Sequence, residues 1–264
     1  MNKILKSCND NKHTLEAVYK PNGDITKNAE ETLEVMTRTH FKDSVTDPPV
    51  PPPDPLPITT TLLNTIYSPD RIEEALKSFD PLKAAGPDTL KPIIIQKAWT
   101  HIKDITRTIM TKNHETQHIP TLWKESLGIF LPKPGKTDYN QPKSFRTITL
   151  SPVMLKLQEK VILWHMQHDL NIANDINKRQ FGFKKGCSTE AALHKVTHTI
   201  ERRIAKKGYV LGVFLDIEGA FDNVSFKAIS DAIKTTKVYP ATAQWIINMV
   251  TNRFITLNHK DKSK

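Results

Sequence analysis

The sequence predicts an α/β fold in which helices dominate and a few strands form a small sheet. Two observations support this prediction. Several segments combine a helix-capping residue with apolar side chains at helical spacing. Between them lie short runs with the composition of strands, such as VLGVFLDI at residues 210–217. We therefore expect capped helices to alternate with a few strands along the chain.

The composition excludes some classes of protein and leaves others open. The 38 Lys and Arg residues against 28 Asp and Glu residues give a formal charge of +10. Such a chain can bind nucleic acid or an anionic membrane surface, although an ordinary basic surface explains the charge equally well. The apolar runs are far shorter than the roughly 20 residues of a membrane-spanning helix, and the N-terminus lacks a signal-peptide core. We expect a soluble intracellular protein, in the nucleus or the cytoplasm, without a membrane partner.

The N-terminal part is polar and ends in a proline-rich segment. Asn28 can cap a helix over residues 28–41. Residues 47–57, DPPVPPPDPLP, contain seven prolines, so we expect an extended polyproline II linker there. A PxxP ligand for a partner domain is the alternative. We place a boundary at this linker, with residues 1–57 as a polar arm and linker and residues 58–264 as one domain.

Helices with recognisable caps fill much of the second domain. Candidate N-cap residues and apolar positions at helical spacing predict helices at residues 68–79, 91–112, 151–170, 188–204, 225–236 and 240–254. The second of these carries Ile94, Ile102, Ile105 and Ile109, and the fourth is expected to turn Leu193, Val196, Ile200 and Ile204 inward. Gly86 and Pro87 separate the first two helices.

A hairpin is predicted ahead of the third helix. Strands at residues 127–131 and 145–150 flank a turn region rich in Gly, Pro and Asn. Lys133 and Arg146 stand among the basic residues of this hairpin. A triphosphate needs cations at fixed positions, and Arg can hold it with a bidentate fork. A solvated basic hairpin is the alternative explanation from these residues alone.

A basic loop with aromatic residues follows at residues 178–188, KRQFGFKKGCS. Unpaired bases can stack on its aromatic rings while its cations bind phosphates. The residues concerned are Arg179, Phe181, Phe183, Lys184 and Lys185. An ordinary basic loop with core anchors is the alternative.

A carboxylate ends the apolar run at residues 210–217, which we expect to be a buried strand. Asp216 lies between two apolar residues, where an unpaired charge would cost several kcal/mol. A carboxylate at the end of a buried strand suits Mg²⁺, which binds one or two carboxylates together with substrate phosphates. A capping Asp at the strand end is the alternative.

The segment FLDIEGAFDN, at residues 214–223, resembles motif A of reverse transcriptases, and in particular of the jockey-like branch of non-LTR retrotransposons. The resemblance implies the fingers and first half of the palm of a right-hand polymerase. It implies that Asp216 binds both catalytic Mg²⁺ ions, with the backbone carbonyl of Ile217 as a further ligand. It also implies that Phe221 packs under the incoming sugar and excludes a ribose hydroxyl.

Other segments extend the resemblance. The hairpin is similar to motifs 1 and 2, where Lys133 and Arg146 match residues that contact the incoming nucleotide or template. The loop at residues 178–188 is similar to the family segment QxGFRxGxST, which contacts template. Two positions depart from the family pattern. Ala85 replaces Pro in KAPGPD, and Thr147 replaces Pro in FRPISL, which affects how Arg146 is presented.

The resemblance also predicts what this stretch of chain can do. Two-metal polymerisation needs more carboxylates than one strand end supplies, and neither the family's YxDD of motif C nor its motif B occurs in these 264 residues. We therefore expect a truncated RNA-directed DNA polymerase, with RNA template, DNA primer and deoxynucleoside triphosphates as partners, that is inactive alone. A non-catalytic nucleic-acid-binding remnant is the alternative. A relationship to group II intron maturases fits motif A less well.

Overall fold

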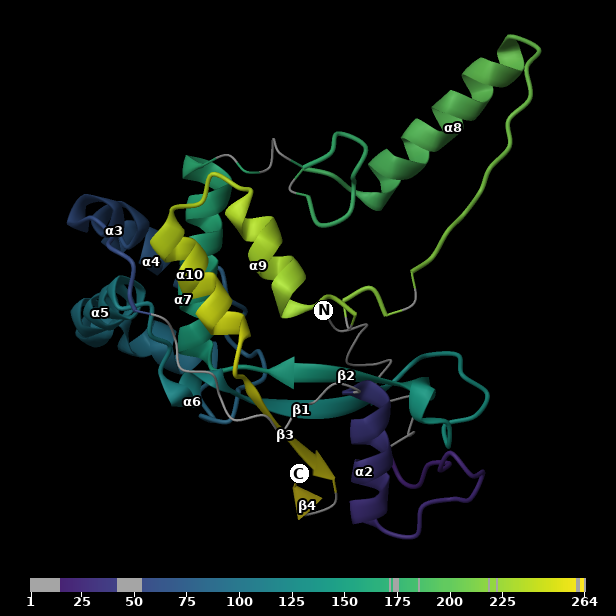
Figure 1. The fold of residues 1–264 in the computed structure, drawn as a ribbon, viewed down its shortest axis with the longest axis horizontal. Coiled ribbons are helices and arrows are strands. Elements are labelled where there is room, and N and C mark those ends of the chain that lie inside the picture. The colour runs from purple at the N-terminus through teal and green to yellow at the C-terminus, as the bar shows by residue number, and fades with distance from the viewer. Residues whose placement is uncertain are drawn as a thin grey trace.

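The computed structural model describes residues 15–41, 54–170, 172, 176–184, 186–217, 219–221, 223–259 and 262–263. It confirms the predicted fold class, because helices pack around a small mixed sheet (Figure 1). The elements are α2 (Ala29–His40), α3 (Thr60–Ile66), α4 (Pro69–Lys77), α5 (Pro92–Glu115), α6 (Thr121–Lys124), β1 (Glu125–Pro132), η1 (Pro142–Ser144), β2 (Phe145–Leu150), α7 (Val153–Trp164), η2 (His165–Asp169), α8 (Thr189–Ala205), α9 (Phe226–Lys234), α10 (Pro240–Val250), β3 (Phe254–His259) and β4 (Lys262–Ser263).

The predicted helices form where the local signals place them. The side chain of Asn28 accepts a hydrogen bond from the backbone N–H of Glu31 and caps α2. Ser188 and Ser225 cap α8 and α9 in the same way. Ser68 has the extended backbone of an N-cap, but its side chain makes no capping bond. Short-range signals were therefore sufficient to locate most helix starts.

The buried face of α5 differs from the expected one. Ile102 packs against the core as expected. Ile94, Ile105 and Ile109 are exposed, whereas Ile95, Trp99 and Met110 face the core. The two sets are offset by about one position around the helix, and both have helical spacing. The other three expected positions were wrong because this long helix is apolar on more than one face, and only packing decides which face is covered.

The sheet has the strand order β2-β1-β3-β4. β1 and β2 form the predicted antiparallel hairpin, with Leu131 opposite Arg146. β3, a strand that was not predicted from the sequence, pairs parallel with the other edge of β1. Gly128 of β1 lies opposite Leu257 of β3, and a Cβ at Gly128 would lie 2.4 Å from a methyl carbon of Leu257. The glycine therefore leaves room for a core side chain of the neighbouring strand.

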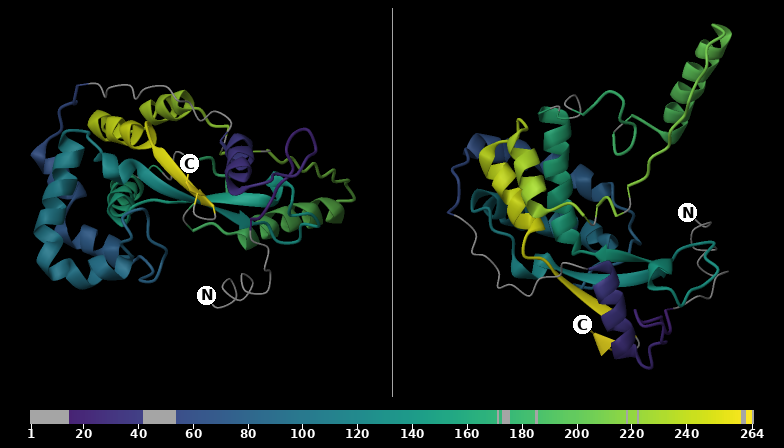
Figure 2. Two further views of the ribbon diagram at one scale, coloured as in Figure 1. Left: turned by 90° about the horizontal axis from the view of Figure 1, so that it is seen from below. Right: turned by 45° about the vertical axis from the view of Figure 1, so that its right-hand side comes forward.

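Helix α2 covers one face of the hairpin. Val18, Met36 and Phe145 are fully buried together, with Phe130 packed against them. Because side chains alternate along a strand, Arg146 lies on the opposite face, where it is exposed. Figure 2 (right) shows α2 on one side of the sheet and α9 and α10 on the other. Part of the N-terminal segment, residues 1–57, thus packs on the hairpin. The domain boundary at residue 57 stays a prediction.

The main core is helical. Helices α3, α4, α5, α7 and α10 contribute to one cluster of buried side chains, in which Tyr67, Leu76, Leu157 and Trp245 are among the largest. Apolar side chains at helical spacing on α4 and α7, among them Leu76 and Leu157, belong to it. Among the helices that the structure describes, none is both long and apolar enough to cross a lipid bilayer.

A chain of hydrogen bonds crosses this core. The amide of Gln158 donates to the hydroxyl of Tyr67 at 2.9 Å, and that hydroxyl lies 3.0 Å from Nδ1 of His114. Nε2 of His114 lies 2.9 Å from the hydroxyl of Thr242. All four residues are fully buried, so the network joins α5, α7, α10 and the end of α3 through satisfied polar groups.

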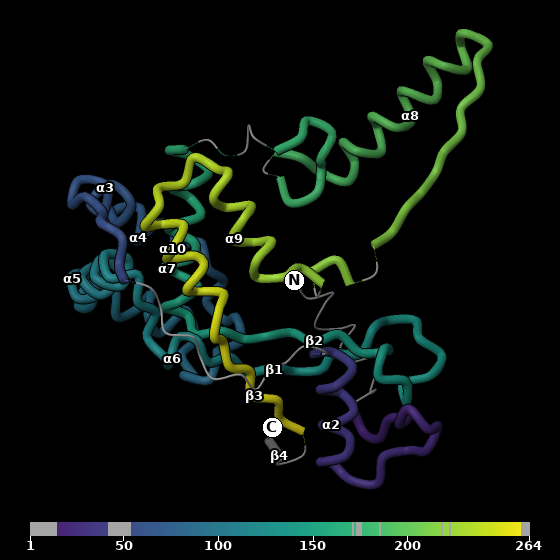
Figure 3. The backbone as a smooth tube through the Cα atoms, in the orientation of Figure 1, coloured from purple at the N-terminus to yellow at the C-terminus, as the bar shows by residue number. Residues whose placement is uncertain are grey.

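Helix α8 and residues 209–217, together called the arm, extend away from the rest of the molecule (Figures 1 and 3). Two predictions are wrong here. Residues 210–217 form no strand, and Leu211, Phe214 and Leu215 are 89%, 94% and 90% exposed. Helix α8 has no buried residue, although its apolar face was expected to point inward.

The reason for both errors is the same. A strand is stabilised by backbone pairing and by packing against neighbouring strands. The sheet in the described part of the chain is made of β1 to β4, and none of these strands pairs with residues 210–217. The apolar pattern is therefore present without the contacts that would bury it.

Candidate nucleic-acid and nucleotide site

The open end of the hairpin presents the two predicted cations. Lys133 follows the last residue of β1, and its backbone N–H donates to the carbonyl of Ser144 at 2.8 Å. Arg146 lies two positions further along β2, opposite Leu131. The structure therefore brings Lys133 and Arg146 to the same end of the hairpin.

The side chains of Lys133 and Arg146 differ in the hydrogen bonds that they make within the fold. The ammonium of Lys133 donates to the carbonyl of Lys143 at 2.7 Å, which holds it against the turn. The hydroxyl of Tyr139 donates to the carbonyl of Lys133 at 2.8 Å and fixes the backbone beside it. The exposed guanidinium of Arg146 has no hydrogen-bond or ion-pair partner within the described ranges. Arg146 is thus free to form a bidentate contact with phosphate.

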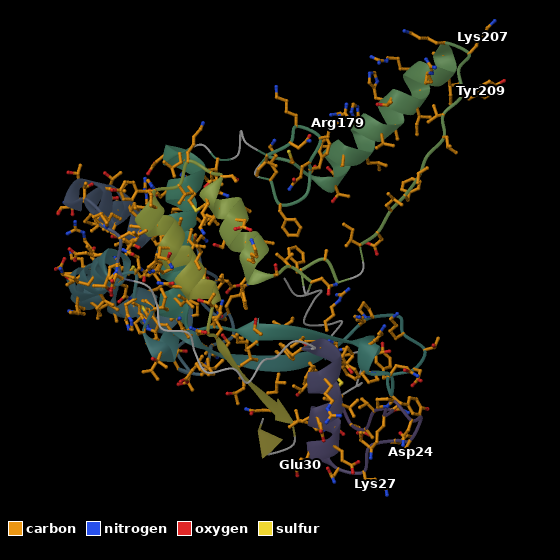
Figure 4. The ribbon with its side chains drawn as sticks, in the orientation of Figure 1. Asp24, Lys27, Glu30, Arg179, Lys207 and Tyr209 are labelled. Atoms are coloured by element: carbon orange, nitrogen blue, oxygen red, sulfur yellow. The ribbon has the colours of Figure 1, made fainter. Side chains whose placement is uncertain are left out.

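The basic loop lies just ahead of α8, where Figure 4 places Arg179. The backbone N–H of Arg179 donates a hydrogen bond to the side-chain oxygen of Asn177 at 2.9 Å. This short turn holds the start of the loop in place. The ammonium of Lys195 from α8 lies 5.4 Å from the ring centroid of Phe181, within cation–π range. Lys184 is half-buried. Lys185 lies outside the described residues.

An aromatic pair joins this loop to the motif A segment. The rings of Phe183 and Phe221 meet edge to face, with centroids 5.5 Å apart and an angle of 83° between the planes. Phe183 is 89% exposed and Phe221 is 76% exposed, so the pair stands at the surface. Two residues that are far apart in the sequence, each predicted to contact nucleic acid or nucleotide, therefore touch in the fold.

The predicted metal ligand is accessible. The carboxylate of Asp216 and the side chain of Ile217 are both exposed. The two acidic residues that follow, Glu218 and Asp222, lie outside the described residues. Within the described ranges, no group of three or more His, Cys, Asp and Glu residues could hold a metal ion. Asp216 fits as one Mg²⁺ ligand, but these residues do not make a two-ion site.

Comparison with known proteins identifies this arrangement. Residues 131–264 match the model of the family described as "Reverse transcriptase (RNA-dependent DNA polymerase)". This match covers the hairpin end, the basic loop and the motif A segment.

The chain belongs to the reverse transcriptase family.

Relatives in insects indicate which branch of the reverse transcriptase family the chain resembles. The chain is 29% identical over 235 residues to a probable RNA-directed DNA polymerase from transposon BS of Drosophila melanogaster, covering 84% of this chain and 25% of the relative. It is 31% identical over 142 residues to the RNA-directed DNA polymerase from mobile element jockey of the same species, covering 54% and 15%. It is 30% identical over 181 residues to a probable RNA-directed DNA polymerase from transposon X-element, covering 67% and 19%. These relatives belong to non-LTR retrotransposons, and the chain spans a quarter or less of each.

One polar cluster was not predicted from the sequence. The guanidinium of Arg253, just before β3, donates to the hydroxyl of Ser151 at 2.9 Å, and Ser151 lies 3.2 Å from the hydroxyl of Ser126. The cluster ties the start of β3 to both hairpin strands. Burial raises the pKa of Glu159 on α7, while the nearby Arg253 and Lys156 oppose that rise.

The sequence held a weak signal for this cluster, because NRF at residues 252–254 precedes a strand-like alternation. The KAAGPD segment packs next to it. A Cβ at Gly86 would lie 2.7 Å from the carbonyl carbon of Ser151, so this position accepts only glycine without a backbone shift. The glycine thus seats the loop against the end of the hairpin in the reverse transcriptase fold.

Proposed function

We propose that this chain supplies the fingers and the first part of the palm of an RNA-directed DNA polymerase of a non-LTR retrotransposon. Its substrates are an RNA template, a DNA primer and deoxynucleoside triphosphates. Lys133 and Arg146 bind the incoming nucleotide, and the loop at residues 178–185 binds the template. We place the protein inside the cell, in the nucleus or the cytoplasm, where these substrates occur.

The contact between Phe183 and Phe221 carries this proposal. It joins the loop that would hold the template to the residue that would lie under the incoming sugar. Polymerisation requires template and nucleotide to meet at one place, because positioning supplies much of the rate enhancement. Exposed rings suit this role, since each can stack on a base or a sugar face once the substrate arrives.

Asp216 would hold the metal ions in this polymerase, together with the backbone carbonyl of Ile217. Bound Mg²⁺ would supply charge neutralisation on the triphosphate and activation of the primer hydroxyl. The residues of this chain do the rest. Arg146 neutralises phosphate charge through its fork, and Phe221 limits the space beside the sugar.

A second candidate function is nucleic-acid binding without catalysis. The observation that favours it is the absence, within the described residues, of any cluster of carboxylates able to hold a metal ion. A basic protein with exposed aromatic rings needs no metal to bind single strands.

The test compares two proteins in primer extension on poly(rA) with Mg²⁺. One is the 264-residue chain, and the other is the same chain fused to the matching C-terminal part of the jockey polymerase. We expect synthesis from the fusion alone. Asp216→Ala should lower the fusion's rate by about 10²–10³ or more, because an aligned charge is lost.

The control is Asp104→Ala, which removes an exposed carboxylate from α5 and should leave synthesis unchanged. If the fusion folds and binds template–primer but synthesises nothing, the non-catalytic function is favoured. If the chain alone synthesises DNA in an Asp216-dependent manner, the expectation that it is inactive by itself is wrong.

A further inference from the structure

A pocket lies at the far end of the arm, at the opposite end of α8 from the loop at residues 178–188. It has a volume of about 350 Å³ and is lined by Thr199, Arg202, Arg203, Lys206 and residues 209–211. Helix α8 has 17 residues, and at 1.5 Å per residue its C-terminal end, which forms one wall of the pocket, lies roughly 25 Å from that loop. The pocket is thus a site of its own.

The turn after α8 builds this pocket. Lys207 and Gly208 reverse the chain, with Lys207 at a φ of 55°, and the N–H of Gly208 donates to the carbonyl of Arg203 at 3.0 Å. A Cβ at Gly208 would lie 2.8 Å from Nε of Arg203. The guanidinium of Arg203 therefore packs on the glycine, which positions it at the pocket wall.

The charge of the pocket is uncompensated. In the described part of the chain, no ion pair joins a carboxylate to Arg202, Arg203 or Lys206. The carbonyl end of a helix attracts cations and repels anions, so the side chains alone must attract an anionic ligand. Two guanidinium forks and an ammonium beside one another have the chemistry of a phosphate site.

One aromatic ring stands beside these cations without any cover. Tyr209 is 98% exposed, and Figure 4 shows it with Lys207 where α8 ends and the chain turns back. A ring that packs on nothing in the fold has both faces open. Unpaired bases stack on such rings while neighbouring cations bind the phosphates between them.

We propose that this pocket binds single-stranded nucleic acid, with Tyr209 stacked on one base and Arg202, Arg203 and Lys206 on the adjacent phosphates. The site goes beyond the polymerase function, because it shares no residue with the hairpin, the loop at residues 178–185 or motif A. It would hold a strand at a distance of one helix length from the template loop.

The experiment uses the 264-residue chain and a labelled single-stranded RNA that carries photoreactive 4-thiouridine. Crosslinked peptides are identified by mass spectrometry, and affinity is measured by fluorescence anisotropy at several salt concentrations. We expect a crosslink within the peptide that contains Tyr209. Tyr209→Ala should weaken binding at this site by about tenfold, while Tyr209→Phe should retain it, since stacking requires the ring and not the hydroxyl.

Neutral substitutions test the role of the three cationic side chains in binding. Arg202→Gln, Arg203→Gln and Lys206→Gln combined should reduce the slope of log affinity against log salt by about 2, at roughly 0.7 per phosphate contact on a single strand. The control is Lys97→Gln with Lys103→Gln, two exposed lysines of α5, which should leave the crosslink at Tyr209 in place.

Three outcomes would overturn the proposal: no crosslink at the arm, equal binding by the Tyr209→Ala variant, or binding of anionic phospholipid vesicles without binding of RNA. A crosslink confined to residues 178–184 overturns this inference and leaves the polymerase proposal standing. A crosslink at Tyr209 that persists in a variant with Lys133→Ala and Arg146→Ala supports the inference independently of that proposal.

Discussion

His114 shows how a single buried side chain can make stability depend on pH. Tyr67 accepts a hydrogen bond from Gln158, so its own proton is available to Nδ1 of His114, and Nε2–H can then donate to Thr242. Only the neutral ring fits this chain of bonds. Burial, helped by the nearby His165, lowers the pKa of His114 from 6.5 to about 3.

This pKa predicts destabilisation in mild acid. Below about pH 6.5 the unfolded chain binds a proton at His114, whereas the folded chain binds this proton only near pH 3. Stability is therefore full above neutral pH and falls by about 1.4 kcal/mol for each pH unit below 6.5. Denaturant unfolding at pH 7.5 and pH 5 should differ by about 2 kcal/mol from this residue.

The His114→Gln variant isolates the effect. It should be less stable at pH 7.5 but should lose most of the pH dependence between pH 7.5 and pH 5. The matched control is His101→Gln, which changes an exposed histidine on the same helix and should keep that dependence. An unchanged pH dependence in His114→Gln would assign it to other groups.

At the scale of elements, the contact between α2 and the hairpin decides how Lys133 and Arg146 are presented. Met36 of α2 is fully buried against Phe145, which precedes Arg146 in β2. Met36→Ala should destabilise this unit by about 2–5 kcal/mol, because a buried side chain leaves a cavity. Hydrogen exchange at the β2 amides should become faster.

Arg38→Ala on the same helix is the control for this prediction. Its side chain is 79% exposed and its ion pair with Glu34 is at the surface, where such pairs contribute little. If Met36→Ala leaves exchange in β2 as slow as Arg38→Ala does, α2 does not support the hairpin.

The structural features that could be predicted from the sequence are those that depend on residues near one another in the chain. Asn28, Ser188 and Ser225 locate their helices because a cap involves residues within one turn. The hairpin strands were predicted because a connection rich in Gly, Pro and Asn separates two strand-like runs that are near each other in the sequence. β3 was missed because its partner β1 is distant in the sequence and the pairing is parallel.

The same distinction between local and long-range features holds for the candidate site. Residues of the motifs could be selected from the sequence, but their contacts could not. The pairing of Phe183 with Phe221 and the bond between Arg253 and Ser151 depend on the tertiary fold. The strand expected at residues 210–217 is the converse case, because its apolar pattern is correct for a strand and the structure gives it no partner.

For the whole molecule, the uneven distribution of packing predicts where proteolysis begins. Lys206 and Lys207 lie in the turn that joins the two parts of the arm, just after the end of α8, and none of the residues of that helix is buried. Local opening costs least where few contacts are made. Limited trypsin digestion should therefore cut after these lysines before it cuts after Lys97 or Lys103 in α5.

Mass spectrometry of early time points checks this order, and the exposed lysines of α5 are the internal control. Added single-stranded RNA should slow cleavage at Lys206 and Lys207 if the pocket at the end of the arm binds it. Equal rates of cleavage in the arm and in α5 would mean that the arm is packed in solution.

The parallel pairing of β1 with β3 also has a consequence during synthesis on the ribosome. Glu125 pairs with Phe254, about 130 positions later, whereas the hairpin partner β2 follows β1 closely. At about 5–20 residues per second, the second edge of β1 waits roughly 6 to 26 seconds for its partner strand. During that interval the nascent chain displays an unpaired strand edge. The newly made protein therefore passes through a stage in which a chaperone has a defined segment to shield.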